Sequence, residues 1–117
     1  MSSSEILRKQ KNKVREFYIS RPYFWDRAHH HYRDQNLRTH ELSTLASDIG
    51  VHADAITKWF ANQRTLYLSY KKDDMERLEY GKQPIVSEGR LWTLANMDFL
   101  ADHIKPRKPK KSKIMLL

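Results

Sequence analysis

The stretch from Ala53 to Lys72, ADAITKWFANQRTLYLSYKK, constrains the fold of this chain more than any other segment. Read at about 100° per residue, it divides into two helical faces. The first face is mostly apolar and carries Ile56, Phe60, Gln63, Tyr67 and Tyr70. The opposite face carries Lys58, Asn62, Thr65, Ser69 and Lys72. The pattern predicts a long amphipathic helix over residues 53–79, stopped by Gly81 and Pro84.

The polar face of this helix has the groups that a DNA-reading helix needs. Amides and hydroxyls can bond base edges, ammonium groups can bind phosphates, and no carboxylate interrupts them. An ordinary amphipathic helix with a solvated polar side is the alternative interpretation.

A second helix precedes this one at a short interval. Leu42, Leu45, Ala46 and Ile49 are spaced i, i+3, i+4, i+7, which predicts a helix from about Asn36 to Ile49. Gly50 can end it in the left-handed conformation, and only three residues then separate the two helices. This arrangement is typical of a helix-turn-helix, with the later helix as the recognition helix.

The remaining segments complete an all-α prediction. A first helix is expected from Ser4, as N-cap, to about Ser20, with Leu7, Val14, Phe17 and Tyr18 as its apolar stripe. Arg21-Pro22 ends it, and the aromatic run Tyr23 to Trp25 is expected to pack back on the core from a long connection. Residues 83–90 read as a loop. Asn96 is expected to cap a short C-terminal helix carrying Met97, Leu100 and Ile104 and ended by Pro106.

Composition excludes several classes of protein. The chain has no cysteine, so disulfides, Cys-ligated zinc and thiol nucleophiles are ruled out. We find no nucleophile–base pair, no paired carboxylates in an apolar setting and no phosphate-cradling glycine loop, so neither an enzyme nor a cofactor is expected. The start MSSSEILRKQ is not that of a signal peptide, and no apolar run is long enough to span a membrane.

Three consecutive histidines, His29, His30 and His31, suggest a metal site. Neighbouring residues in a loop rarely all face one ion, so a polar loop without a metal is the preferred interpretation.

The net charge of +8 is concentrated at the two ends of the chain. Residues 16–104 carry eleven Lys and Arg against thirteen Asp and Glu. The excess lies in an early cluster that includes Arg8, Lys9, Lys11 and Lys13, and in a basic tail over residues 105–117. Basic flanks around a near-neutral body favour nucleic acid as the partner. A membrane surface is less favoured because neither flank has an apolar face fit to insert.

Nearly the whole chain resembles a MADF domain, a Myb/SANT-like DNA-binding module. The matching pieces are Arg21-Pro22, Phe24-Trp25-Asp26, Tyr32, Leu42, Leu45, Ala46, Phe60, Arg64, Trp92 and the run Met97 to Leu100. The chain departs from the family pattern at Leu42 and Phe60, which replace tryptophans, and at Gln63, which replaces leucine. The resemblance implies a domain over residues 5–104, followed by the basic tail.

A shorter stretch, LASDIGVHADAITKWFANQR, is similar to the second half of a homeodomain. Its W-F-x-N-x-R pattern aligns with Trp59, Phe60, Asn62 and Arg64, and the resemblance implies an adenine-reading amide at Asn62. A homeodomain has a shorter connection before its second helix, and usually a second basic residue where this chain has Gln63.

Together these features predict a sequence-specific double-stranded DNA-binding domain of a nuclear transcription or chromatin regulator. Lys58, Asn62 and Thr65 would face bases, with Ser69 on the same side. Arg64, Lys71, Lys72 and the early basic cluster would hold phosphates. A SANT-like module that binds transcription or chromatin proteins is the alternative, and the sequence leaves open whether the domain forms a homodimer.

Overall fold

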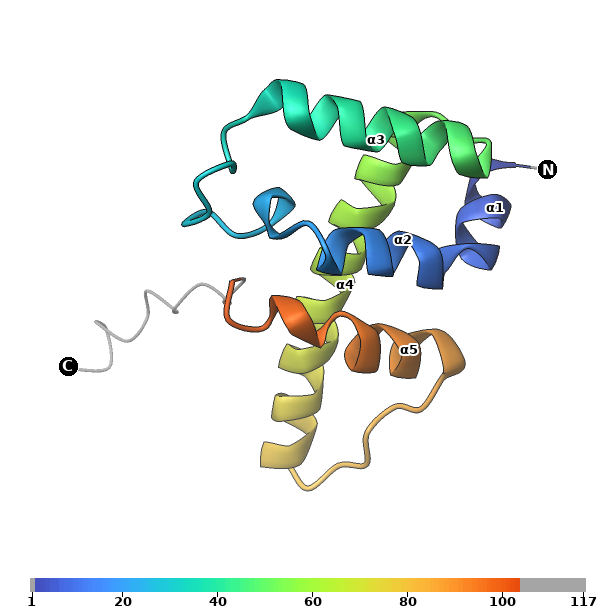
Figure 1. Cartoon of the computed structure of the whole chain (residues 1–117). Coiled ribbons are helices and arrows are strands. Elements are labelled where there is room, and N and C mark those ends of the chain that lie inside the picture. Colours follow the sequence, from blue (N-terminus) through green and yellow to red (C-terminus); the bar gives the residue numbers. More distant parts are fainter. Residues whose placement is uncertain (1, 104–117) are drawn as a thin grey trace.

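A computed structural model describes residues 2–103, and that part of the chain contains helices and turns but no strand. Its elements in order are α1 (Ser3–Lys9), α2 (Lys11–Ile19), the 3-10 turn η1 (Pro22–Phe24), α3 (Gln35–Ile49), α4 (Ala53–Glu79), α5 (Glu88–Asn96) and the 3-10 turn η2 (Asp98–Leu100). In Figure 1, α4 runs the length of the molecule, α2 and α3 pack around its first part, and α5 crosses it lower down. The all-α prediction is confirmed.

The expected first helix is broken in two, and this part of the prediction is wrong. The chain turns at Gln10 (φ −101°, ψ 15°), and α1 begins after Ser2, whose hydroxyl accepts a hydrogen bond from the Glu5 N–H at 3.2 Å. The turn brings α1 against α4, whereas α2 continues along the core. All four residues of the expected apolar stripe are nevertheless buried.

The helix-turn-helix is present as expected. The Asp34 carboxylate caps α3 by accepting the Leu37 N–H at 3.0 Å. Gly50 ends α3 with φ 79° and ψ 37°, a left-handed conformation that only glycine adopts without strain. Its N–H donates to the Ala46 carbonyl at 2.9 Å, and α4 then begins at Ala53.

Aromatic packing seats α4 against α2, and the aromatic run after Pro22 contributes as predicted. The Tyr18 ring stacks on the Phe60 ring with centroids 3.7 Å apart and planes 9° from parallel. Phe24 meets the edge of Tyr18, and the Trp25 indole N–H donates to the Tyr18 carbonyl at 2.7 Å. Trp25 also packs edge-on to Phe99 at 5.3 Å, so the connection between α2 and α3 covers the core.

The C-terminal part differs from the prediction. The Ser87 hydroxyl caps α5 by accepting the Arg90 N–H at 3.3 Å, so a helix begins inside the expected loop. Asn96 is the last residue of α5 rather than an N-cap, and η2 follows it. Gly89 conceals the helix start in the sequence because glycine disfavours helix interiors. Ile104, Pro106 and the tail lie outside the described residues, and no helix described here is both long and apolar enough to span a bilayer.

Candidate nucleic-acid interface

The polar side of α4 is exposed along its first two-thirds. Its exposed side chains are Lys58, Asn62, Thr65, Ser69 and Lys72, whereas Ile56, Phe60 and Tyr67 on the other side are buried. Among the described residues, the Asn62 carboxamide bonds to no other group. Thr65 donates its hydroxyl to the Ala61 carbonyl at 3.1 Å, which leaves its oxygen and methyl group free. We call these five residues the α4 polar face.

Contacts from the opposite side fix α4 without covering this face. The Thr93 hydroxyl of α5 donates to the Gln63 amide oxygen at 2.8 Å. The Tyr67 hydroxyl donates to the Asp98 carboxylate at 2.7 Å, which ties η2 to α4. Because α5 and η2 pack on the side of Gln63 and Tyr67, the α4 polar face stays open over about 21 Å of helix.

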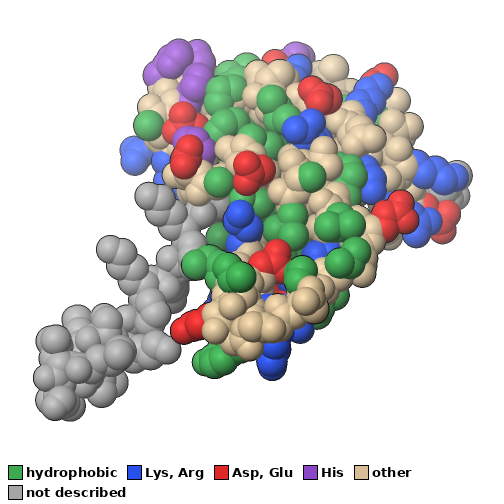
Figure 2. Space-filling model, turned by 90° about the horizontal axis from the view of Figure 1, so that it is seen from below, with side chains coloured by type: hydrophobic (Ala, Val, Ile, Leu, Met, Phe, Trp, Pro, Cys, Tyr) green, Lys and Arg blue, Asp and Glu red, His purple; other side chains and the backbone are tan. Residues whose placement is uncertain are grey.

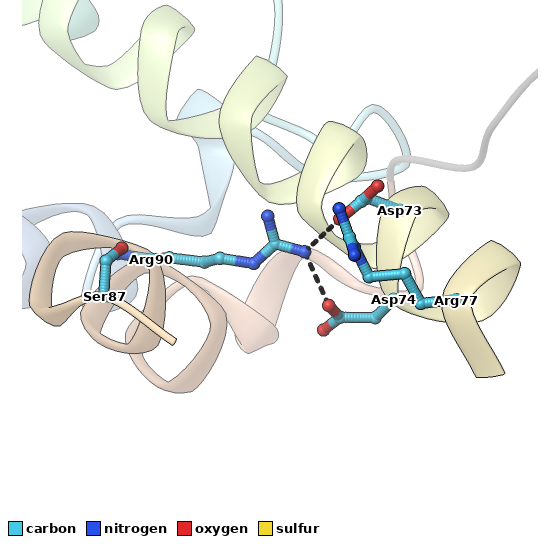
Figure 3. A network of polar contacts seen from close by, with 5 residues as sticks. All are labelled: Asp73, Asp74, Arg77, Ser87 and Arg90. Atoms are coloured by element: carbon cyan, nitrogen blue, oxygen red, sulfur yellow. Dashed lines mark hydrogen bonds and ion pairs between the residues drawn. The ribbon is translucent and has the colours of Figure 1, made fainter. Parts of the chain in front are cut away.

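The polar face ends where α4 becomes acidic. No Asp or Glu lies between Asp54 and Asp73, but Asp73, Asp74, Glu76 and Glu79 follow within about two turns. There Arg90 of α5 donates to the carboxylates of Asp73 and Asp74, at 2.6 Å each (Figure 3). Arg77 donates to Asp73 at 2.8 Å, and these hydrogen bonds, from Arg77 and then from Arg90, lower the pKa of Asp73. The sequence interpretation assigned Arg90 to a loop and so missed this network.

The cations that flank the polar face differ in their availability. Arg64 is partly buried, and its Nε atom is enclosed without a hydrogen-bond partner among the described residues. Lys71 lies on the side of α4 away from Lys58, and its Nζ is 5.8 Å from the centre of the Tyr67 ring. Lys72, the last residue of the α4 polar face, is exposed and forms no ion pair within the described part.

The early basic cluster is divided between α1 and α2. Arg8 and Lys9 are exposed in the last turn of α1, and Arg8 lines a cleft beside Trp59 and Gln63. Lys11 lies over the Trp92 ring at 4.7 Å, and Lys13 pairs with Asp48 of α3. Arg8 and Lys9 are therefore the freer cations of the four.

The rings of the three consecutive histidines lie against one another, His29 stacked on His30 and His31 tilted against both. The His29 and His30 rings are 4.6 Å apart, and the His30 and His31 rings 4.0 Å. Within residues 2–103, no group of His, Asp and Glu side chains has a metal-binding arrangement.

The sequence interpretation also missed α3 as part of this surface. Arg38, in the first turns of α3, lines a pocket together with Thr57 and Arg64 of α4. The spacing in the sequence gives no direct signal for this meeting, since it depends on the angle at which α3 crosses α4. A basic residue on the flank of the helix before the turn is the only hint.

Comparison with known proteins supports one of the two resemblances. The family model described as "Alcohol dehydrogenase transcription factor Myb/SANT-like", a MADF DNA-binding family, matches residues 16–100. No curated protein and no solved structure matched the chain. The matched segment runs from α2 through η2 and includes the whole α4 polar face. The chain belongs to the MADF family of Myb/SANT-like DNA-binding domains.

Proposed function

We propose that this domain binds double-stranded DNA sequence-specifically, with α4 in the major groove, as part of a nuclear transcription or chromatin regulator. The observation that carries the proposal is the α4 polar face, which is exposed and free of carboxylates from Lys58 to Lys72. Its length of about 21 Å exceeds the roughly 12 Å width of the major groove, so the face can cross the groove and still reach phosphates at its borders.

Each side chain of the face has a role set by its chemistry. Asn62 offers one acceptor and two donors, which match the N6 amino group and N7 of adenine. Lys58 and Thr65 lie within one helical turn of it and would meet neighbouring bases. Lys72, Arg64 and Lys71, together with Arg8, Lys9, Lys11 and Lys13 beyond α4, would bind phosphates, which supply affinity but little specificity.

Selection of binding sites from random duplexes, followed by substitution, tests this proposal. Asn62→Ala should lose about 1–3 kcal/mol on the selected site and relax the preference at one base position. The matched control, Lys72→Ala, should weaken selected and random duplexes alike. Thermal melts of both variants must agree with the parent, because a folding defect would imitate lost binding. If Asn62→Ala binds the selected site as tightly as the parent, α4 does not read bases.

A second candidate function is a protein-interaction module, and one observation favours it. Several large hydrophobic side chains near the C-terminal end of α4 are exposed, among them Met75, Leu78, Tyr80 and Val86. Figure 2, which views the molecule from that end, shows hydrophobic, acidic and basic side chains side by side rather than a basic field. Such a mixed surface suits a protein better than DNA. Binding of other transcription or chromatin proteins there is compatible with DNA binding by the α4 polar face.

A further inference from the structure

A pocket of about 290 Å³ lies between the first turns of α3 and the side of α4. Tyr18 and Phe60 contribute to its apolar walls, and Gln35, Arg38, Thr57 and Arg64 contribute its polar groups. The volume far exceeds the roughly 10–15 Å³ that one water molecule needs in this measure, so a tetrahedral anion fits. We call it the Arg38–Arg64 pocket.

The pocket offers several hydrogen-bond donors that lack acceptors. The Arg64 side chain forms no hydrogen bond or ion pair within the described residues; its Nε is enclosed, so its two terminal guanidinium nitrogens are the donors that a ligand can reach. Arg38 forms no ion pair in that part of the chain and only lies near the Tyr32 ring, at 5.6 Å.

The absence of acidic side chains separates this pocket from the larger one between α2 and α3. That cavity, of about 950 Å³, is lined by Glu16, Glu41 and Asp48 as well as by cations. Its Arg21 donates to Glu41 at 3.2 Å, and its Lys13 pairs with Asp48. An anion entering there would meet carboxylates, whereas no carboxylate lines the Arg38–Arg64 pocket.

We infer that the Arg38–Arg64 pocket holds one backbone phosphate of the DNA strand that borders the major groove. Thr57 and Arg64 are sequence neighbours of Lys58 and Thr65, so the pocket flanks the α4 polar face. Two guanidinium groups bind a phosphate through several charge-assisted hydrogen bonds. This inference rests on the proposed function and adds α3 to the DNA-binding surface.

The test compares Arg38→Gln with Arg33→Gln, which removes an equal charge from the exposed connection outside the pocket. Dissociation constants are measured over a range of salt concentrations on the selected duplex and on a random one. Arg38→Gln should weaken both about tenfold, as expected for one hydrogen bond to a charged group. It should also flatten the dependence of log K on log salt by about 0.9 for the one phosphate lost. Arg33→Gln should change neither quantity.

A change on the DNA side confirms the contact without altering the fold. Single phosphates of the selected duplex are replaced in turn by neutral methylphosphonates. At one position the replacement should weaken the parent more than Arg38→Gln does, because it removes the partner of both arginines, and it should weaken the Arg38→Gln variant less than it weakens the parent. If the parent prefers its selected duplex but Arg38→Gln keeps the parent's affinity and salt slope, the pocket is not a phosphate site and the proposed function stands. If the parent binds every duplex equally, sequence-specific reading fails, and the loss of affinity and salt slope in Arg38→Gln still decides the phosphate assignment. If the parent binds no duplex, both fail.

Discussion

The two parts of α4 differ although they form one continuous helix. The first part, Ala53–Lys72, is held from behind by stacked rings and by hydrogen bonds with Thr93 and Asp98, and its front carries no carboxylate past Asp54. The second part, 73–79, carries four carboxylates and is held by Arg90. A phosphate backbone would be attracted to the first part and repelled by the second. The boundary between Lys72 and Asp73 therefore limits the length of helix that can lie in a groove.

The largest effect is expected from removing a side chain that supports the first part of α4. Trp25 is half-buried, donates to the Tyr18 carbonyl and packs on Phe99, and Tyr18 in turn stacks on Phe60 of α4. Trp25→Ala should lower the free energy of unfolding by about 3 kcal/mol, the low end for a tryptophan because the ring is not fully enclosed. Thermal or denaturant unfolding measures this, and an unchanged midpoint would mean that the connection does not support α4.

The boundary itself is tested by two charge changes one turn apart. Lys72→Glu should weaken binding to every duplex by about 1–2 kcal/mol, because it replaces a phosphate-binding cation by a repelling anion. Glu76→Ala, on the same side of the helix but in the second part, should leave affinity unchanged or raise it slightly. Both residues are exposed, so the fold should tolerate either change. A gain in affinity for Glu76→Ala as large as the loss for Lys72→Glu would mean that phosphates also lie beside the second part, and would remove the boundary.

The sequence predicted the first part of α4 far better than its surroundings. The five exposed residues of the α4 polar face follow from a single period, which tertiary contacts do not alter, and the bounds of α4 follow from Gly50 before it and Gly81 and Pro84 after it. The turn at Gln10 has no glycine or proline to mark it, and Gly89 hides the start of α5. The pairing of Arg90 with Asp73 and Asp74, and the meeting of Arg38 with Arg64, join residues on different helices. Their positions depend on how helices cross, which periodicity does not determine.

Alkaline pH should act on the first part of α4 through Tyr67. Burial, and then the hydrogen bond to Asp98, raise the pKa of Tyr67 from 10.0 to about 12. The protonated Tyr67 hydroxyl therefore contributes fully to the free energy of unfolding below about pH 10, and this contribution is lost as the pH rises toward 12. Tyr67→Phe removes the hydrogen bond, should cost about 1 kcal/mol at neutral pH and should lessen the loss of stability between pH 10 and 12. Unfolding curves over this range measure the difference, and equal pH profiles for parent and variant would contradict the assignment.

Acid should act on the second part of α4, with the smallest effect. The pKa of Asp73 lies below its ordinary value of 3.8 because Arg77, and then Arg90, donate hydrogen bonds to its carboxylate. The ionised Asp73 carboxylate therefore stabilises the folded state above pH 3.8. This contribution is lost as the pH falls through the lower pKa that Asp73 has in the folded protein. The Asp73 side chain is about one-third exposed, so solvent screening keeps the effect small.

Hydrogen exchange should show amides near residues 73–79 losing protection below pH 4, before those near Phe60. Arg90→Met removes two of the hydrogen bonds and should reduce that early loss, whereas an equal response of both parts to acid would mean that ion pairs do not distinguish them.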